Sequence, residues 1–537
     1  MENAMKLDFG CPGDMSRHWP PSGAGLQVPK AANASFLEGP RLSGREIPLV
    51  FGASRGESKG MNRRAFGRIM TACAAGLGFQ ETHRMLAAEA SPARDRFGGW
   101  KGSRFTATGF FRVEKDERWW LVTPEGNAFL SFGINHLYPD LWRQDYNREA
   151  WQKRLGVKNL KEWNQFAPAL RSWFLQTCDE YGFNTVGVHN SLQIVNRPQP
   201  AVAYMQPIRF IDIPHWKPIV PDINFLDVFS LEFAARCERL AKEIAAPLKD
   251  DPFLLGYSMT DCPLFTEEDC RERPDVIGGA RRASRIGFPR RLRNLGPDAA
   301  GKQAYVKTMR RIYRDSIKEF NATYGTKFRS FDALAKATDW RPHTQLSNAE
   351  ETRDNTKFLQ VVVEKYYQLA RDSIRRHDPN HLFVGDKLNA NTDSIDTVLP
   401  VTSKYTDVVF YQAYARYEVQ QPGLDRWSKI TDKPKINGDS AFTMVTDTMP
   451  RPYGPIADNL EQRAEWTTEF FRQAFARPDF VGWHYCGLID ASQKVPRKQS
   501  RQHSGLLDGY GNPYPALQKG LKAAASEMYE IATLGNG

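Results

Sequence analysis

Eight short apolar runs, each ending in polar residues, recur along this chain and restrict its fold more than any other feature. Apolar residues at helical spacing lie between most of these runs. Strands and helices that alternate in one long chain predict an α/β fold, a (β/α)8 TIM barrel. An open doubly wound sheet is the alternative, and the lack of a G-x-G-x-x-G turn after any early strand weakens it. The predicted strands are 130–135, 185–190, 209–212, 254–259, 382–386, 408–412, 434–438 and 481–485.

Two segments are expected to decorate the barrel. Strand-like runs at 110–113, 119–122 and 128–130, with a turn at 124–127, predict an N-terminal β-hairpin. The gap after the fourth strand, about 262–381, is too long for a simple connection and predicts an insertion with a lid and two or more helices. The helical patterns lie at 305–320, 358–374 and 466–475.

The first 90 residues differ in composition from the rest. Residues 1–60 are rich in Gly, Pro and Ser and predict a disordered leader or an over-extended start. Residues 61–90 resemble a twin-arginine signal peptide, with Met61, the Arg63-Arg64 pair and an Ala-Glu-Ala cleavage pattern at 88–90. We therefore expect export to the periplasm or the medium and a catalytic domain over 91–537. No stretch is apolar for long enough to span a bilayer.

Charge and cysteine usage argue against several classes of partner. The net charge is +11, but Lys and Arg are spread along the chain, so we expect no nucleic-acid partner. None of the seven cysteines lies in a zinc-type pattern, so we expect no metal and no cofactor. A basic run after the eighth strand is either a solvated loop or a contact for an acidic glycan. It comprises Lys494, Arg497, Lys498 and Arg501.

Two carboxylates occupy the positions where a barrel presents its chemistry, the C-terminal ends of strands. Asp261 follows the fourth predicted strand and Asp439 the seventh, on nearly opposite sides of the barrel mouth. Glycoside hydrolysis uses two carboxyl groups that flank the scissile bond. The pattern predicts Asp261 as general acid/base and Asp439 as nucleophile or second base. Either could instead cap a helix or form an ion pair.

Other polar and aromatic residues at the strand ends are candidates for sugar binding. We expect Tyr411 or Tyr414 to hydrogen-bond Asp439, and Trp483 to stack on a sugar ring. Asp386 and Lys387 could pair with each other or bind a substrate charge. The full candidate set is Asn135, His136, His189, Asn190, Asp386, Lys387, Tyr411, Tyr414, Trp483 and His484.

Several ordered motifs carry a resemblance to a known family. They are Trp-Leu-Val-Thr-Pro-Glu-Gly at 120–126, Phe-Gly-Ile-Asn at 132–135, Gly-Phe-Asn-Thr-Val-Gly at 182–187, Phe-Asn-Ala-Thr-Tyr-Gly at 320–325 and Asp-Pro-Asn-His-Leu at 378–382. In this order they resemble the large clan of (β/α)8 glycoside hydrolases with acids after strands four and seven, and bacterial agarases within it. The resemblance runs from about residue 110 to 517 and implies hydrolysis of a poly- or oligosaccharide.

The chain departs from that clan at the acids themselves. The clan pattern is Asn-Glu after strand four and Glu after strand seven, whereas this chain has Thr260-Asp261 and Asp439. With shorter side chains the gap could open to about 7–8 Å and favour inversion. Alternatively, loops could move inward and keep retention, or the barrel could bind a glycan without cleaving it. A barrel lyase or isomerase with Lys387 or His484 as base also stays open, as does the oligomeric state.

Overall fold

The computed structural model describes most of the chain beyond the N-terminal segment. The described residues are 94–192, 201–211, 227–263, 265, 287–342, 347–390, 394–446, 449–450, 452–491 and 503–534. The leader, the twin-arginine-type segment and the basic run at 494–501 lie outside the described residues.

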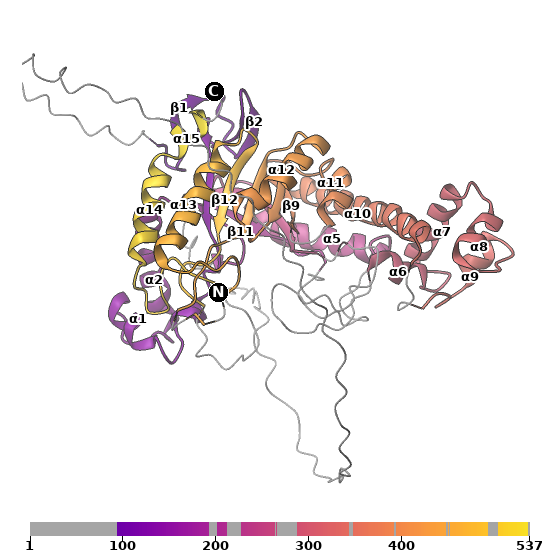
Figure 1. Cartoon of the computed structure of the whole chain (residues 1–537), viewed down its shortest axis with the longest axis horizontal. Helices are drawn as coiled ribbons and strands as arrows, with labels where there is room; N and C mark the ends of the chain where they lie inside the picture. The colour runs from indigo at the N-terminus through magenta and orange to yellow at the C-terminus, as the bar shows by residue number, and fades with distance from the viewer. Residues whose placement is uncertain are drawn as a thin grey trace, which may run out of the picture. The chain divides into compact units, whose positions relative to one another are not determined.

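Eight parallel strands close into a barrel, as the sequence predicts (Figure 1). Each strand pairs with the next one along the chain, and the last pairs with the first. All eight are almost entirely buried, which explains why they appear as continuous apolar runs rather than alternating ones. The strands are β5 (Ser131–Ile134), β6 (Thr185–Val186), β7 (Ala203–Pro207), β8 (Leu254–Asp261), β9 (Leu382–Asn389), β10 (Val409–Gln412), β11 (Lys435–Ser440) and β12 (Phe480–Tyr485).

The third strand is the one whose prediction is wrong. The sequence predicts it at 209–212, but the structure has it earlier, as β7 (Ala203–Pro207). Phe210 and Ile211 are 0% and 2% exposed, so their apolar run reflects burial in a packed loop rather than pairing in the sheet. Hydrophobicity alone does not separate these two cases. Asp212, the expected end of this strand, lies outside the described residues.

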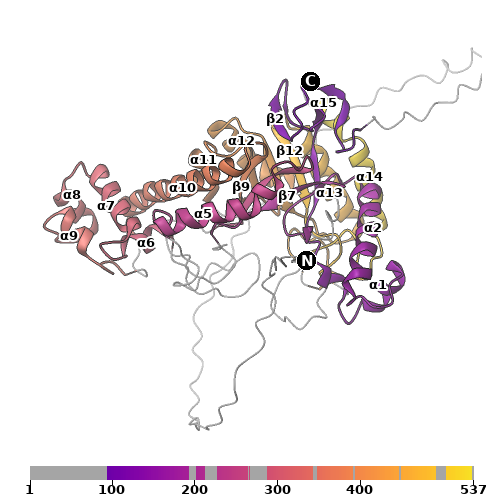
Figure 2. The same ribbon diagram turned by 180° about the vertical axis from the view of Figure 1, so that it is seen from behind.

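Helices alternate with the strands and surround the barrel (Figures 1 and 2). The predicted helices at 358–374 and 466–475 are confirmed within α10 and α13. The pattern at 305–320 is two helices, because Arg314 and Asp315 between them have positive φ angles. No described helix is long and apolar enough to cross a membrane. The surrounding helices are α2 (Trp163–Tyr181), α5 (Leu231–Ile244), α10 (Ala349–His377), α11 (Ser394–Thr402), α12 (Tyr417–Ile430), α13 (Leu460–Ala476) and α14 (Pro515–Ser526).

The segment between β8 and β9 carries additional helices, as expected for an insertion. Helices α7, α8 and α9 gather near the N-terminal end of the long helix α10 (Figure 2). The C-terminal half of α10 packs beside α5 and α11 as a barrel helix. The inserted helices are α6 (Phe288–Arg293), α7 (Ala300–Ile312), α8 (Ile317–Tyr324) and α9 (Phe331–Lys336).

A buried ion cluster holds the insertion together, and we expect its loss to be costly. Glu351 on α10 accepts hydrogen bonds from Arg293 and Arg341, and the glutamate is fully buried. Replacing it in Glu351→Gln leaves two buried guanidinium groups without a counter-charge, which should cost about 3–5 kcal/mol of unfolding free energy. Urea unfolding measures this change. The exposed neighbour in Glu350→Gln is the control, and a cost similar to the control would contradict the prediction.

The N-terminal hairpin belongs to a four-stranded antiparallel sheet. It comprises β1 (Trp100–Arg104), β2 (Arg112–Lys115), β3 (Trp119–Val122) and β4 (Asn127–Phe129), in the order β1-β4-β3-β2. Arg118, at the β2–β3 turn, is 1% exposed, and its guanidinium donates to the carbonyls of Phe475, Arg477, Phe480 and Ala532. Because Phe480 opens β12, these bonds fix the sheet at the N-terminal end of the barrel strands. A functional site can therefore form at the C-terminal ends of the barrel strands.

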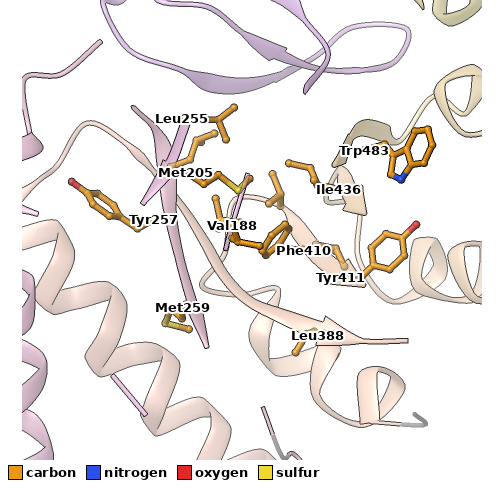
Figure 3. Close-up of a cluster of buried hydrophobic side chains, with 14 of the residues drawn as sticks. Val188, Met205, Leu255, Tyr257, Met259, Leu388, Phe410, Tyr411, Ile436 and Trp483 are labelled. Carbon is orange, nitrogen blue, oxygen red and sulfur yellow. The ribbon is translucent and has the colours of Figure 1, made fainter. Parts of the chain in front are cut away.

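Apolar side chains pack inside the barrel and between its strands and the surrounding helices (Figure 3). Each residue labelled there is at most 6% exposed. A filled barrel of this kind is a core rather than a channel, so a site must lie at the rim where the strands end. The labelled residues are Val188, Met205, Leu255, Tyr257, Met259, Leu388, Phe410, Tyr411, Ile436 and Trp483.

Candidate active site

Three residues directly after barrel strands have an unusual backbone conformation. His136, His189 and Cys262 have φ angles of 58°, 61° and 49°, in the left-handed region that non-glycine residues rarely adopt. They follow β5, β6 and β8. Such strain costs about 1–3 kcal/mol per residue and concentrates at functional sites. The rim thus holds three of the six described non-glycine residues with positive φ, and the insertion holds the other three, Arg314, Asp315 and Asp339.

Lys387 lies at the centre of this rim and joins the two predicted catalytic carboxylates. Its ammonium nitrogen is 2.7 Å from Asp439 Oδ2 and 3.0 Å from Asp261 Oδ1. It also lies 3.0 Å from His189 Nε2. Its hydrogen bonds go to Asp439 and His189, and Asp261 Oδ1 is an ion-pair partner. One oxygen of Asp261 and one oxygen of Asp439 contact this nitrogen. These two oxygens therefore lie within about 6 Å of each other.

The charges at this centre stabilise one another. Burial alone would raise the pKa values of Asp261 and Asp439, but the Lys387 ammonium and nearby histidines outweigh burial and hold both well below their usual range. Burial would lower the pKa of Lys387, but the two aspartates outweigh it and raise that pKa above its usual value. At neutral pH the centre therefore consists of two carboxylates and one ammonium.

Asn135 orients Asp439. Its Nδ2 donates to Asp439 Oδ1 at 3.0 Å and to the Gly438 carbonyl at 2.8 Å. Gly438 is required beside it, because a Cβ there would lie 1.9 Å from the Phe410 ring. Its amide nitrogen therefore holds the carboxylate in place, and its predicted role as a sugar ligand stays a prediction.

Both predicted histidines lie against the carboxylates. His189 Nε2 is 3.3 Å from Asp261 Oδ2, and His136 Nε2 is 3.7 Å from Asp439 Oδ2. Asn190 holds the loop that carries His189: its side chain accepts from the Leu137 amide and donates to two carbonyls. Asn190 therefore shapes the rim through the backbone.

A small cavity of about 20 Å³, roughly the space that one water molecule needs, lies beside Asp261. At 16% exposure the Asp261 side chain is more accessible than that of Asp439, at 4%. The lining residues are Val188, His189, Pro207, Arg209, Ser258, Met259, Asp261, Lys387 and Phe410.

Two predicted site residues, Trp483 and Tyr411, point away from the rim. Trp483 is 0% exposed, lies against Phe470, and donates from its indole to Ser440, so it cannot form a sugar platform there. The Tyr411 hydroxyl donates to Gln420 at 3.2 Å rather than to Asp439.

Asp386 does not pair with Lys387 either. Its Oδ1 accepts from the Thr260 amide and from the Tyr366 hydroxyl of α10. Burial raises its pKa to about 7. Neighbours on a strand face opposite sides of the sheet, so Lys387 faces the site and Asp386 faces the helices.

Two further predicted residues lie close to the centre. His484 sits inside the barrel, 2.9 Å from the Ser131 hydroxyl, and burial lowers its pKa to about 3. It forms the floor of the site rather than a sugar contact. Tyr414 packs its ring on Tyr453 at 4.3 Å. Burial and the Asp439 charge raise the pKa of Tyr414, so this neutral phenol borders the nucleophile candidate.

The structure adds two residues that the sequence prediction missed. Cys486, one position after β12, has its sulfur 2.9 Å from Nδ1 of His503. The His503 ring stacks on that of His136 at 4.0 Å. The strand-end rule could have found Cys486. His503 had no such signal, because it lies on a loop far beyond the strand. Histidine nitrogens and a thiol together can hold a metal ion.

The fold and site thus define a (β/α)8 barrel with two carboxylates after its fourth and seventh strands, and known agarases share its fold. The chain is 23% identical over 510 residues to β-agarase B of Vibrio sp. (strain JT0107), a match covering 82% of this chain and 50% of that protein. It is 23% identical over 485 residues to β-agarase A of the same organism, covering 79% and 46%. The chain therefore spans about half the length of these two relatives.

Solved structures give the same result for the fold. An exo-β-agarase superposes with a TM-score of 0.67 at 16% identity, covering 82% of this chain and 68% of that one. A second agarase gives 0.66 at 18% identity with the same coverage. No family model matches the chain. At these identities the likeness shows the barrel architecture.

Proposed function

We propose that this chain is a glycoside hydrolase that cleaves a poly- or oligosaccharide of the agar type, with Asp261 and Asp439 as its catalytic pair. The observation that carries the proposal is the placement of the two carboxylates, which lie within about 6 Å of each other where β8 and β11 end. The similarity to β-agarases over most of this chain supports the substrate class.

Asp439 is the better nucleophile of the two. Lys387 holds it ionised and Asn135 fixes its orientation, which are the two requirements for attack on an anomeric carbon. Attack forms a bond between the carboxylate and that carbon as the leaving oxygen departs with a proton, and water then hydrolyses the ester. The two carboxylate oxygens that contact Lys387 lie within about 6 Å of each other, which fits this retaining route better than the 6.5–9.5 Å typical of inversion.

Asp261 lines the small cavity and suits the acid/base role. A general acid must carry a proton, whereas Lys387 holds Asp261 ionised in the substrate-free site. A sugar bound between the carboxylates therefore has to separate Asp261 from the ammonium. Burial then dominates and raises the Asp261 pKa, so that the group can protonate the leaving oxygen.

The electrostatics weigh against a lyase or isomerase. The raised pKa of Lys387 keeps it protonated at neutral pH, and a protonated amine is no base. His484 lies in the floor of the site, 0% exposed, with no access to substrate. A barrel that binds glycan without cleaving it remains the alternative, because the Lys387 clamp neutralises part of the carboxylate charge.

The cellular location of the protein and the charge of its substrate are further parts of the proposal. We propose that the chain acts outside the cytoplasm, after export through the segment at 61–90. The basic run at 494–501 lies outside the described residues. Whether this run selects anionic glycans is tested by including sulfated agars among the substrates.

The Asp261→Asn variant tests the proposed role of this residue. Removing a general acid/base should lower kcat on agar oligosaccharides by about 10²–10⁴-fold. The loss should shrink for a nitrophenyl glycoside, whose leaving group needs no proton. Reducing-sugar release and nitrophenol absorbance measure both. If the wild type binds glycans but releases no sugar from any panel member, the binding-only alternative holds.

A further inference from the structure

A second cluster of side chains lies beside the carboxylates, and of its members only His136 is also described above as lying against Asp439. His136 follows β5, Cys486 follows β12, and His503 lies on the loop beyond it. One ligand atom from each falls within 4.8 Å of the others. We propose that His136, Cys486 and His503 bind a zinc ion at the mouth of the barrel, next to Asp439.

The donor set selects the class of metal. Two imidazoles and a thiolate suit Zn²⁺, which takes nitrogen and sulfur ligands in a tetrahedron, whereas Mg²⁺ and Ca²⁺ prefer oxygen. Zinc bonds of about 2.0–2.3 Å place tetrahedral ligand atoms roughly 3.3–3.7 Å apart. The present separations surround that range: the Cys486 sulfur is 2.9 Å from His503 Nδ1, and the upper limit is 4.8 Å. Small side-chain rotations would close the site.

The three ligands are already held in place. β5 and β12 pair directly, with Ile134 opposite Tyr485, which places His136 and Cys486 near each other. The His503 carbonyl accepts from the Ala491 amide at 3.0 Å, and neighbouring Ser504 hydrogen-bonds Thr443. A preformed site of this kind avoids the cost of ordering its ligands on binding.

His136 offers a buried ring nitrogen as a metal ligand. His136 Nε2 is buried and makes no hydrogen bond within the described part of the chain. The thiol proton of Cys486 leaves when a sulfur–zinc bond forms.

Charge balance supports a dication here. Without a metal, two buried carboxylates face one ammonium, so the centre carries one uncompensated negative charge. A zinc ion with a Cys486 thiolate adds a net single positive charge and neutralises it. Asp439 Oδ2 lies 3.7 Å from His136 Nε2, so the carboxylate is next to the proposed site. The proposal departs from the sequence expectation of no metal, because the ligands come from distant segments.

Metal binding to the full chain tests this proposal. The protein is stripped with a chelator and titrated with Co²⁺ or Zn²⁺ alone. A thiolate-to-cobalt charge-transfer absorption and one bound zinc per chain are expected for the wild type. Cys486→Ser should lose the absorption and weaken zinc binding on the order of 100-fold or more.

The matched control is Cys178→Ser, which alters another buried cysteine on α2, outside the site. It should bind metal as the wild type does. Circular dichroism checks the fold of each variant, and His136→Gln replaces Cys486→Ser in the comparison if the latter does not fold. Absence of the thiolate absorption in the wild type, or its persistence in the variants, would overturn the proposal. The readout needs no hydrolysis, so it is independent of the proposed function.

Discussion

The Lys387→Met variant is expected to lose about 3–5 kcal/mol of unfolding free energy at neutral pH. In the wild type this ammonium contacts Asp261, Asp439 and His189, and only 2% of its side chain is exposed. Methionine fills a similar volume but leaves two buried carboxylates facing each other. When one partner of a buried ion pair is removed, the other charge stays buried without a counter-charge, and its full desolvation cost destabilises the folded state.

The loss should depend on pH in a defined direction. In the wild type the pKa values of both aspartates are lowered, so their contribution to stability is present above the unfolded-state pKa and is lost as pH falls. In the variant, burial and mutual repulsion raise at least one of these pKa values. That cost is then absent at low pH and grows as pH rises. The difference between the two proteins should be large near pH 8 and small near pH 4.5.

Urea unfolding followed by tryptophan fluorescence at both pH values measures this effect. The double variant Lys387→Met/Asp439→Asn should recover part of the stability, because it removes one of the unpaired charges. Lys404→Met, which replaces a 58% exposed lysine, is the control. A loss that is equal at both pH values would show that Lys387 acts through packing alone.

The Asp439→Asn variant is expected to lower kcat on agar oligosaccharides on the order of 10³-fold or more. Asparagine keeps the shape and can still contact Lys387 and Asn135, so the fold should persist. It lacks the charge required to attack the anomeric carbon. The effect should exceed that of Asp261→Asn on substrates with good leaving groups, since the nucleophile is needed whatever departs.

Chemical rescue separates a nucleophile from a positioning residue. In Asp439→Gly, azide can enter the vacated space, attack the anomeric carbon and form a glycosyl azide of inverted configuration, as the leaving group departs with a proton. The anomer is identified by NMR. Asp396→Asn, which changes a 44% exposed ion-pair partner, should act as the wild type. Undiminished turnover in Asp439→Asn would remove it from the catalytic pair.

The sequence predicted the barrel well because each parallel strand is buried on both faces and appears as a short apolar run. Seven of the eight predicted strands overlap the observed ones. The exception is the third strand, where a buried loop has the same apolar pattern as a strand. Phe210 is as buried as a strand residue although it lies in a loop. Burial is encoded in one residue, whereas strand pairing depends on a partner elsewhere in the chain.

The site was harder to predict for a different reason. Strand ends locate the rim, but side chains alternate between the site and the helices. Lys387 and His484 face inward, whereas their neighbours Asp386 and Trp483 face outward. The contact between Lys387 and both carboxylates depends on how β8, β9 and β11 are arranged around the barrel, which no local pattern encodes.

The hydrogen bonds of Arg118 can form only late in the synthesis of the chain. Its guanidinium needs the carbonyls of Phe475, Arg477, Phe480 and Ala532, which the ribosome adds some hundreds of residues later. Three of these acceptors arrive with residues 475–480, and the last, Ala532, arrives only with α15 (Met528–Leu534). Barrel closure therefore follows synthesis of nearly all the described chain, and chaperones that hold nascent chains would meet this protein with its first sheet still undocked.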